Sequence, residues 1–305
     1  MRFPFVLIPH ATDIDFIGKR WLAFSFSITI SVLTLILFFT HGLNLGIDFT
    51  GGIIMETRSD KNISVHQYRE VLADAGYPGA SLQNFGGESN VLIRLQPKDT
   101  DAQAKEVEHI KSVLTSKIDS EIEFRKVDYV GPKIGKELIT NGILAMVLAL
   151  VGIMIYIAIR FSWQYGIGAI IALFHDGWVT VGFYIISGFE FDLTAVAAIL
   201  TIIGYSINDT VVIYDRIREN LRKYKVVSMS DIINRSVNET LSRTVMTVLT
   251  TLIACLALVV FGGDVIRGFS TAMLFGIAFG TYSSIYIAAP VLMHTGFKAS
   301  ASATA

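Results

Sequence analysis

Charge and cysteine are both scarce in this sequence. Only 17% of its 305 residues are charged and 52% are hydrophobic, whereas a soluble domain has about 25% charged residues. This deficit of charge indicates a protein that is embedded in lipid. The net charge of -1 argues against a nucleic-acid partner, because phosphate binding needs a clustered excess of Lys and Arg. The single cysteine, Cys255, excludes a disulfide framework and a thiolate metal site.

Several enzyme signatures are also missing from the sequence. It contains no Walker-type glycine loop, no zinc-spaced pair of histidines and no nucleophile elbow. Gly51-Gly52 follows an apolar span instead of opening a helix after a strand, so it does not predict a phosphate loop. Tyr214-Asp215 resembles one motif of intramembrane aspartyl proteases, but their second motif, Gly-x-Gly-Asp, is absent. We therefore expect no catalytic site, no metal site and no cofactor.

Long apolar windows are the dominant feature that is present. A bilayer core about 30 Å thick needs roughly 20 apolar residues in a helix. Six windows of this kind occur, at 21–41, 138–159, 163–186, 193–214, 244–263 and 268–293. We expect a terminal segment at 1–20, a connecting loop at 215–243 and a tail at 298–305. The first window is too long for the apolar part of a cleavable signal peptide, so we expect it to be a membrane span.

Lys and Arg are distributed unevenly between the two ends of these spans. One set of connections carries eleven: Arg2, Lys19, Arg20, Arg160, Arg216, Arg218, Arg222, Lys223, Lys225, Arg235 and Lys298. The short connections at the other ends carry only Arg267. Positive charge in short loops marks the cytoplasmic side. The pattern predicts two cytoplasmic termini and an insertion between spans one and two that faces outside, in the periplasm.

This insertion, residues 42–137, changes to a pattern of short strands and amphipathic helices. The predicted order is strand 49–57, helix 64–75, strand 81–85, strand 91–96, helix 101–118 and strand 121–130. Ser64 is the expected N-cap of the first helix, and Gly86-Gly87 is the expected turn between the middle strands. The β-α-β-β-α-β order is that of a ferredoxin-like α+β domain. His66 and His109 lie among charged residues and are expected to be solvated.

Two ionisable residues are candidates for a site inside the membrane. An ionisable side chain within a span costs about 2.5–3.5 kcal/mol and is a functional hypothesis by default. Asp209 lies inside the fourth span, beside a polar and small-residue stripe of Thr201, Gly204, Tyr205, Asn208 and Val212. Arg243 precedes the fifth span, whose first turns carry Thr244, Thr247, Thr250 and Thr251. Because these two spans are antiparallel and consecutive, Asp209 and Arg243 can lie at similar depth, where the carboxylate can titrate.

Other interpretations of the polar residues stay open. Asp209 and Arg243 could form a static ion pair that sets helix register. Asp176, next to His175 in the third span, is a second candidate for titration or for hydrogen bonding between helices. Asp215 and Arg216 are better explained as a solvated helix end. In the last span, the spacing of Gly276 and Gly280 predicts tight helix packing.

Four motifs resemble one family. Leu45–Gly52 follows the first span, Val130–Gly135 precedes the second, and Tyr205–Asn220 and Leu241–Thr244 belong to the fourth and fifth. In this order around six spans they resemble the SecF-type members of the SecD/SecF family, which are bacterial protein-translocase subunits of the resistance-nodulation-division superfamily. The resemblance extends from about residue 15 to 297 and leaves out the tail at 298–305.

The resemblance implies a non-enzymatic membrane protein of the bacterial inner membrane. SecF-like proteins lie in the lipid bilayer, act with SecD, the SecYEG channel, YajC and the ATPase SecA, and use the proton motive force to pull unfolded preprotein outward. The family's intramembrane Asp and Arg fall on Asp209 and Arg243. Two alternatives stay open: a small-molecule or lipid exporter built from one half of a transporter, and an assembly factor that only stabilises SecD. A carboxylate serves protons or sodium ions equally well.

Two groups of residues are thus predicted to carry function. The predicted proton relay consists of Asp209, Arg243, Asn208, Thr247 and Asp176. The predicted hinge between the outer insertion and the spans consists of Asp48, Gly51, Gly52, Gly131, Pro132 and Gly135. Glycine at such junctions allows backbone angles and close approaches that a Cβ would prevent, so these segments are expected to transmit movement.

Overall fold

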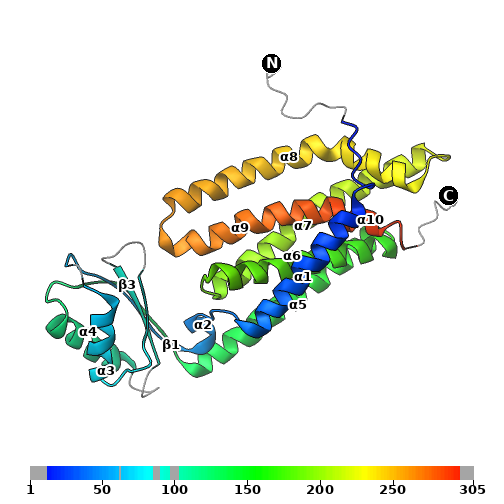
Figure 1. Cartoon of the computed structure of the whole chain (residues 1–305). Coiled ribbons are helices and arrows are strands. Elements are labelled where there is room, and N and C mark those ends of the chain that lie inside the picture. The colour runs from blue at the N-terminus through cyan, green and yellow to red at the C-terminus, as the bar shows by residue number, and fades with distance from the viewer. Residues whose placement is uncertain (1–11, 62, 85–89, 97–102, 296–305) are drawn as a thin grey trace. The chain divides into compact units, whose positions relative to one another are not determined.

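The chain forms two compact units. The computed structural model describes residues 12–61, 63–84, 90–96 and 103–295 (Figure 1). Leu45–Ala145 and Glu190–Leu193 form one unit, which we call the outer domain. The rest of the described chain forms the second unit, which we call the membrane bundle. The long helix α5 (Pro132–Arg160) belongs to the outer domain in its first part and to the bundle in its second.

The outer domain contains the predicted ferredoxin-like arrangement. Its elements are α2 (Ile47–Thr50), β1 (Gly52–Arg58), α3 (Val65–Asp74), β2 (Ser81–Asn84), β3 (Asn90–Leu95), α4 (Gln103–Lys117) and β4 (Glu123–Val130). The four strands pair in the order β2-β3-β1-β4, and every pairing is antiparallel. The predicted turn at Gly86-Gly87 lies outside the described residues.

Helices α3 and α4 cover one face of the sheet. Ile53 and Met55 of β1 are fully buried, and they belong to one apolar cluster with Leu72 of α3 and Ile110 of α4. Alternation along the strand and the 3.6-residue helical period bring these side chains to one layer. Ser64 is the N-cap of α3, as predicted: its side chain accepts from the Gln67 N–H, and the Gln67 side chain accepts from the Ser64 N–H.

The first strand begins later than the sequence indicates. Residues 49 and 50, predicted as strand, are the end of the helical turn α2, and β1 starts at Gly52. Thr50 Oγ1 donates to the Gly46 carbonyl, which stabilises the turn. Gly51 has φ +69° and Gly52 has φ +134°, conformations that L-residues with a Cβ rarely adopt. The glycine pair therefore separates the turn from the strand.

Within the described residues, six helices are long and apolar enough to cross a bilayer. They are α1 (Arg20–Thr40), α5, α6 (Trp163–Ser187), α7 (Leu193–Lys223), α8 (Met229–Phe261) and the last span, made of α9 (Asp264–Ser283), the π-helix η1 (Ser284–Ala288) and α10 (Ala289–Val291). In Figure 1, α9 lies between α8 and α6, and α1 lies against α6. The bundle confirms the predicted number of spans.

The predicted loop at 215–243 is wrong, because most of it is helix. α7 continues to Lys223 and α8 begins at Met229, so only residues 224–228 connect them. Ile217 and Leu221 on α7 and Ile233 and Val237 on α8 are buried in one cluster. Their helical spacing gives each extension an apolar face outside the apolar window. The charged residues of these segments therefore do not end the two helices.

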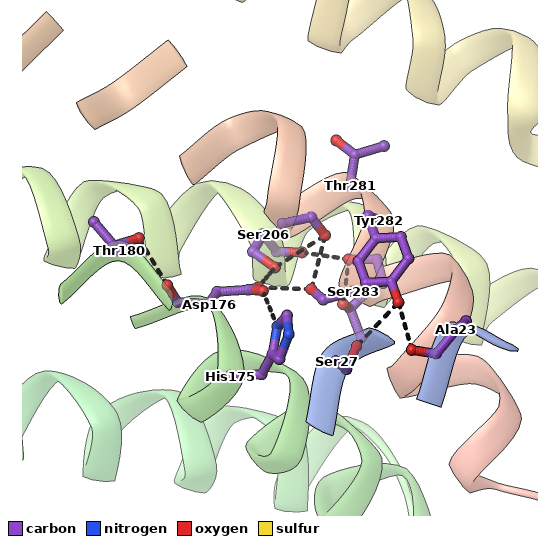
Figure 2. Close-up of polar contacts among 12 residues, drawn as sticks. Ala23, Ser27, His175, Asp176, Thr180, Ser206, Thr281, Tyr282 and Ser283 are labelled. Carbon is purple, nitrogen blue, oxygen red and sulfur yellow. Dashed lines mark hydrogen bonds and ion pairs between the residues drawn. The ribbon is translucent and has the colours of Figure 1, made fainter. Parts of the chain in front are cut away.

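Small residues bring the bundle helices close together, as the glycine spacing predicts. A Cβ on Gly276 of α9 would collide with the Ile202 side chain of α7. α1 is held by hydroxyl groups: Tyr282 Oη donates to the Ala23 carbonyl at 2.7 Å and lies 3.0 Å from Ser27 Oγ (Figure 2). Close packing and such hydrogen bonds replace the hydrophobic effect as the source of helix association in lipid.

A buried acid is a local anchor of the outer domain. Asp119 follows α4, is only 4% exposed, and receives hydrogen bonds from Ser59 Oγ at 2.5 Å and Lys61 Nζ at 2.7 Å. These contacts, led by the Lys61 ammonium, lower the pKa of Asp119 to about 2. They therefore stabilise the folded domain while the carboxylate is ionised.

We expect acid to weaken this anchor over a defined range. Because the folded-state pKa lies below the ordinary value of 3.8, the stabilisation is complete above pH 4 and is lost as the pH falls from about 4 to about 2. The protection factors of β1 and α4 amides in the full chain, measured by hydrogen exchange and corrected for the intrinsic rate at each pH, should fall over this range. Asp119→Asn should remove this acid-dependent change, whereas Asp74→Asn, on the exposed end of α3, should retain it.

Candidate functional site

Asp176 joins three helices inside the membrane bundle. Its side chain, on α6, is only 1% exposed. Its Oδ2 receives the hydroxyl of Ser206 on α7 at 2.6 Å and that of Ser283 on α9 at 2.7 Å (Figure 2). Its Oδ1 lies 3.1 Å from Nδ1 of His175. Both oxygens therefore have partners, and the predicted hydrogen bonding between helices is present.

Hydroxyl contacts continue from this cluster along α7. Thr210 Oγ1 lies 2.8 Å from Ser284 Oγ, and the Ser284 hydroxyl donates to the Ser206 carbonyl at 3.2 Å. One turn further, Tyr214 Oη donates to the Ala288 carbonyl at 3.1 Å. Ser284 and Ala288 are the two ends of the π-helix η1. π-helical segments are rare and often occur at functional sites, and here the segment is held by one face of α7.

Asp209 has a different environment from Asp176. It is 4% exposed and lies on α7, three residues after Ser206. Its Oδ2 has no hydrogen-bond partner among the residues that the structure describes. A buried carboxylate oxygen without a donor is unusual, because buried polar atoms are generally paired. The unpaired Oδ2 therefore makes Asp209 a candidate for a functional role.

The structure assembles the predicted relay only in part. Arg243 is exposed in this chain and acts on Asp209 electrostatically, but the two side chains form no ion pair within 4.0 Å. Thr247 Oγ1 donates within its own helix, to the carbonyls of Arg243 and Thr244. Asn208 is exposed. Asp176 and Asp209 are thus buried, whereas none of the other predicted members forms a hydrogen bond or an ion pair with the Asp209 carboxylate in the described part of the chain.

The polar stripe of α7 is only partly covered. Tyr205 Oη lies 3.1 Å from Thr251 Oγ1 of α8. Thr201, Gly204 and Asn208 of this stripe are exposed. A polar surface at the depth of a membrane span is unfavourable against lipid. This face of the bundle is therefore suited to a protein surface rather than to hydrocarbon.

The predicted hinge residues meet at one end of the outer domain. Asp48 Oδ2 accepts the N–H of Leu193, the first residue of α7, at 3.0 Å. A Cβ on Gly52 would lie 2.8 Å from the Leu95 carbonyl, and one on Gly135 would lie 3.3 Å from the Asp48 carbonyl. Gly131 precedes α5, and Pro132 is its first residue, where the missing N–H of proline costs no helical hydrogen bond. The two glycine motifs are therefore parts of one junction.

The loop between α6 and α7 belongs to this junction, which the sequence did not indicate. The Gly46 N–H donates to the Phe191 carbonyl at 2.9 Å. Arg94 Nη2 of β3 lies 2.6 Å from Glu190 Oε2, and both side chains are mostly buried. Burial raises the pKa of Glu190, and the Arg94 charge opposes this shift. No local pattern marks Arg94 and Glu190 as partners, because they are 96 positions apart.

Two protein-family models match large parts of the chain. Residues 36–63 match the SecD/SecF GG motif, and residues 109–298 match the family described as protein export membrane protein SecD/SecF, C-terminal. The chain belongs to the SecD/SecF family. The GG motif contains the Asp48–Gly52 junction, and the larger match contains Asp176, Asp209 and Arg243. Glu190 of the junction is also inside the larger match, whereas its partner Arg94 lies between the two matched ranges.

Relatives named protein translocase subunit SecF cover nearly all of this family member. The one from Rickettsia bellii is 49% identical over 290 residues, which is 95% of this chain and 96% of the relative. The one from Rickettsia felis is 48% identical over 95% of this chain and 94% of the relative. The chain is accordingly a membrane-embedded translocase subunit, which excludes the exporter alternative.

Two crystal structures share the fold. SecDF from Thermus thermophilus, described as a translocon-associated membrane protein, has a TM-score of 0.84 and 37% identity, over 94% of this chain and 39% of its own. SecDF in a super-membrane-facing form has a TM-score of 0.70 and 36% identity, over 97% of this chain and 40% of its own. The chain therefore spans about two fifths of the SecDF chains that it matches.

The Asp176 cluster generates a stability prediction. Ser206→Ala removes one of the two hydroxyl donors from Asp176 Oδ2 and should destabilise the bundle by about 1–2 kcal/mol. Thermal unfolding of the detergent-solubilised chain measures this. Thr201→Ala is a matched control, because the Thr201 hydroxyl is exposed and donates only within α7, to Ala197. Equal stability of the two variants would contradict the anchoring role of Asp176.

Proposed function

We propose that this chain is the SecF-type subunit that, together with SecD, converts proton movement across the bacterial inner membrane into outward pulling of preprotein. Asp209 is the proposed proton carrier. The observation that supports this role is a carboxylate buried in a membrane span with one oxygen free of hydrogen bonds in the described structure. Both termini would be cytoplasmic, as the distribution of Lys and Arg predicts.

The hydrogen bonds favour Asp209 over Asp176 as the carrier. A proton can bind the open Oδ2 of Asp209 without breaking a contact. At Asp176, Oδ2 already accepts two hydroxyls and Oδ1 faces His175, so a proton on Oδ2 would compete with two donors and a proton on Oδ1 would be shared with His175. Asp176 is therefore proposed as the fixed anchor and Asp209 as the group that changes charge. Asn208 and Thr247 would join Asp209 only in another conformation.

SecD is the proposed partner at the exposed polar face of α7. Thr201, Gly204 and Asn208 are exposed at the depth of a span, where small and polar residues favour close helix–helix contact. The solved SecDF chains are longer than this one, which covers 39% of the first. A second bundle on this face would also shield Arg243 from lipid. SecYEG, YajC, SecA and unfolded preprotein are the further proposed partners.

The junction provides a route from Asp209 to the outer domain. α7 carries Asp209, and its first residue, Leu193, belongs to the outer domain, where Asp48 accepts its N–H. The preceding loop is tied to β3 by Arg94 and Glu190. We propose that a displacement of α7 on proton binding is passed through these contacts to the sheet of the outer domain. Rigid elements with two arrangements are what such coupling requires.

Asp209→Asn tests the proton-carrier role. Asn has nearly the same size and hydrogen-bonding capacity but does not titrate. The variant should associate normally with SecD and lose essentially all gradient-dependent stimulation of export, measured in vesicles with a proton gradient and, separately, a sodium gradient. Asp74→Asn on the exposed surface of α3 is the matched control. Full stimulation by the Asp209→Asn chain would favour the alternative of a SecD assembly factor.

Exchanging Asp209 and Arg243 separates a cycling pair from a static one. The double variant Asp209→Arg, Arg243→Asp retains opposite charges at both positions. It should not restore gradient-dependent export, because an Arg side chain stays charged at every physiological pH. Export by this double variant at the level of the unaltered chain would favour the static interpretation.

Exchanging the charges of Arg94 and Glu190 at the junction should, by contrast, restore function. Arg94→Glu and Glu190→Arg each create a like-charge pair at a mostly buried contact, and each should remove most of the gradient-dependent export. The double variant should restore much of it, because this pair only needs opposite charges. Proton uptake by the bundle should persist in all three variants. If the single variants export normally, the loop does not transmit movement.

A further inference from the structure

A positively charged hollow lies at the C-terminal end of α7, within the membrane bundle. It has a volume of about 620 Å³ and is lined by Arg160, Asp215, Arg218, Glu219, Arg222 and Lys223. Four of these side chains are basic and two are acidic. The hollow therefore has a surplus of positive charge and lies outside the proposed proton relay.

The acidic side chains of the hollow already have partners. Asp215 receives Arg160 Nη2 on both carboxylate oxygens, at 2.7 and 3.0 Å. Glu219 receives Arg216 Nη1 at 2.8 Å. By contrast, Arg222 and Lys223 are exposed and form no ion pair within 4.0 Å with any residue that the structure describes. Two cations are thus available to an anion from outside the chain.

The surroundings of the hollow place it at a membrane surface. Arg160 ends α5, and Ile159 immediately before it is 83% exposed. Trp163, which begins α6, is 64% exposed. Aromatic residues of this kind concentrate at the level of lipid headgroups, and exposed aliphatic residues of a span face acyl chains. An anion that enters the hollow would meet basic side chains, and the exposed apolar side chains of Ile159 and Trp163 flank its lining residue Arg160 in the sequence.

We infer that this hollow binds the headgroup of an anionic phospholipid. The phosphate diester would lie between Arg222, Lys223 and Arg218, and the acyl chains would follow the exposed surface of α5 near Ile159. Arg218 is oriented by a hydrogen bond from its Nη1 to the Arg160 carbonyl at 3.4 Å. Basic pockets between spans on the positively charged side are suited to such headgroups. The inference does not depend on the proton-coupled function.

Lipid retention by the purified full chain tests this inference. The chain is delipidated in detergent, exchanged into mixed micelles with phosphatidylglycerol or phosphatidylethanolamine, and analysed by native mass spectrometry. We expect phosphatidylglycerol to be retained in preference to phosphatidylethanolamine. Arg222→Gln with Lys223→Gln should weaken retention by about tenfold or more, because each cation near a lipid surface contributes about a factor of five.

The matched control removes the same charge from the same end of the bundle. Lys19→Gln with Lys225→Gln changes two exposed lysines that do not line the hollow, and it should retain phosphatidylglycerol normally. Arg222→Lys should also retain it, since the charge is kept. The inference is overturned if both double variants lose lipid equally, if neither does, or if millimolar inorganic phosphate displaces the lipid completely. Circular dichroism of each variant distinguishes lost binding from lost folding.

Discussion

The packing of the bundle depends on the hydrogen bonds that the Asp176 carboxylate accepts from two other helices. An ionisable group inside a membrane protein is tolerated only where other polar groups surround it. Here the donors come from Ser206 and Ser283, on two different helices, so α6, α7 and α9 must keep one register. Gly280 allows this, because even a Cβ there would lie 3.0 Å from the Ser206 side chain. The cost of an unsatisfied Asp176 thus selects one packing of three helices.

α7 links the functional features of the chain. With 31 residues it is about 46 Å long. Its first residue is capped by Asp48, its middle carries Asp209, and its last turn carries Arg222. A register set by Asp176 therefore determines where all three lie.

The membrane explains why a single chain leaves its polar face exposed. In water, Thr201 and Asn208 would be ordinary surface residues. Within a span they face a medium that offers no hydrogen bonds, and Arg243 is likewise exposed in this chain. The bundle thus leaves one face that is suited to a second protein. The arrangement fits the membership of the chain in a family of translocase subunits.

The sequence alone determined the spans, the ferredoxin-like order and the buried position of Asp209, because charge-free windows and helical or strand periods are local properties. It also predicted the N-cap Ser64. The helical extensions of α7 and α8 were missed because charge was taken as the end of a helix. Only the tertiary structure decided which residues meet Asp176 and that Arg94 pairs with Glu190. Such contacts join residues far apart in sequence, and their partners depend on packing that no local pattern encodes.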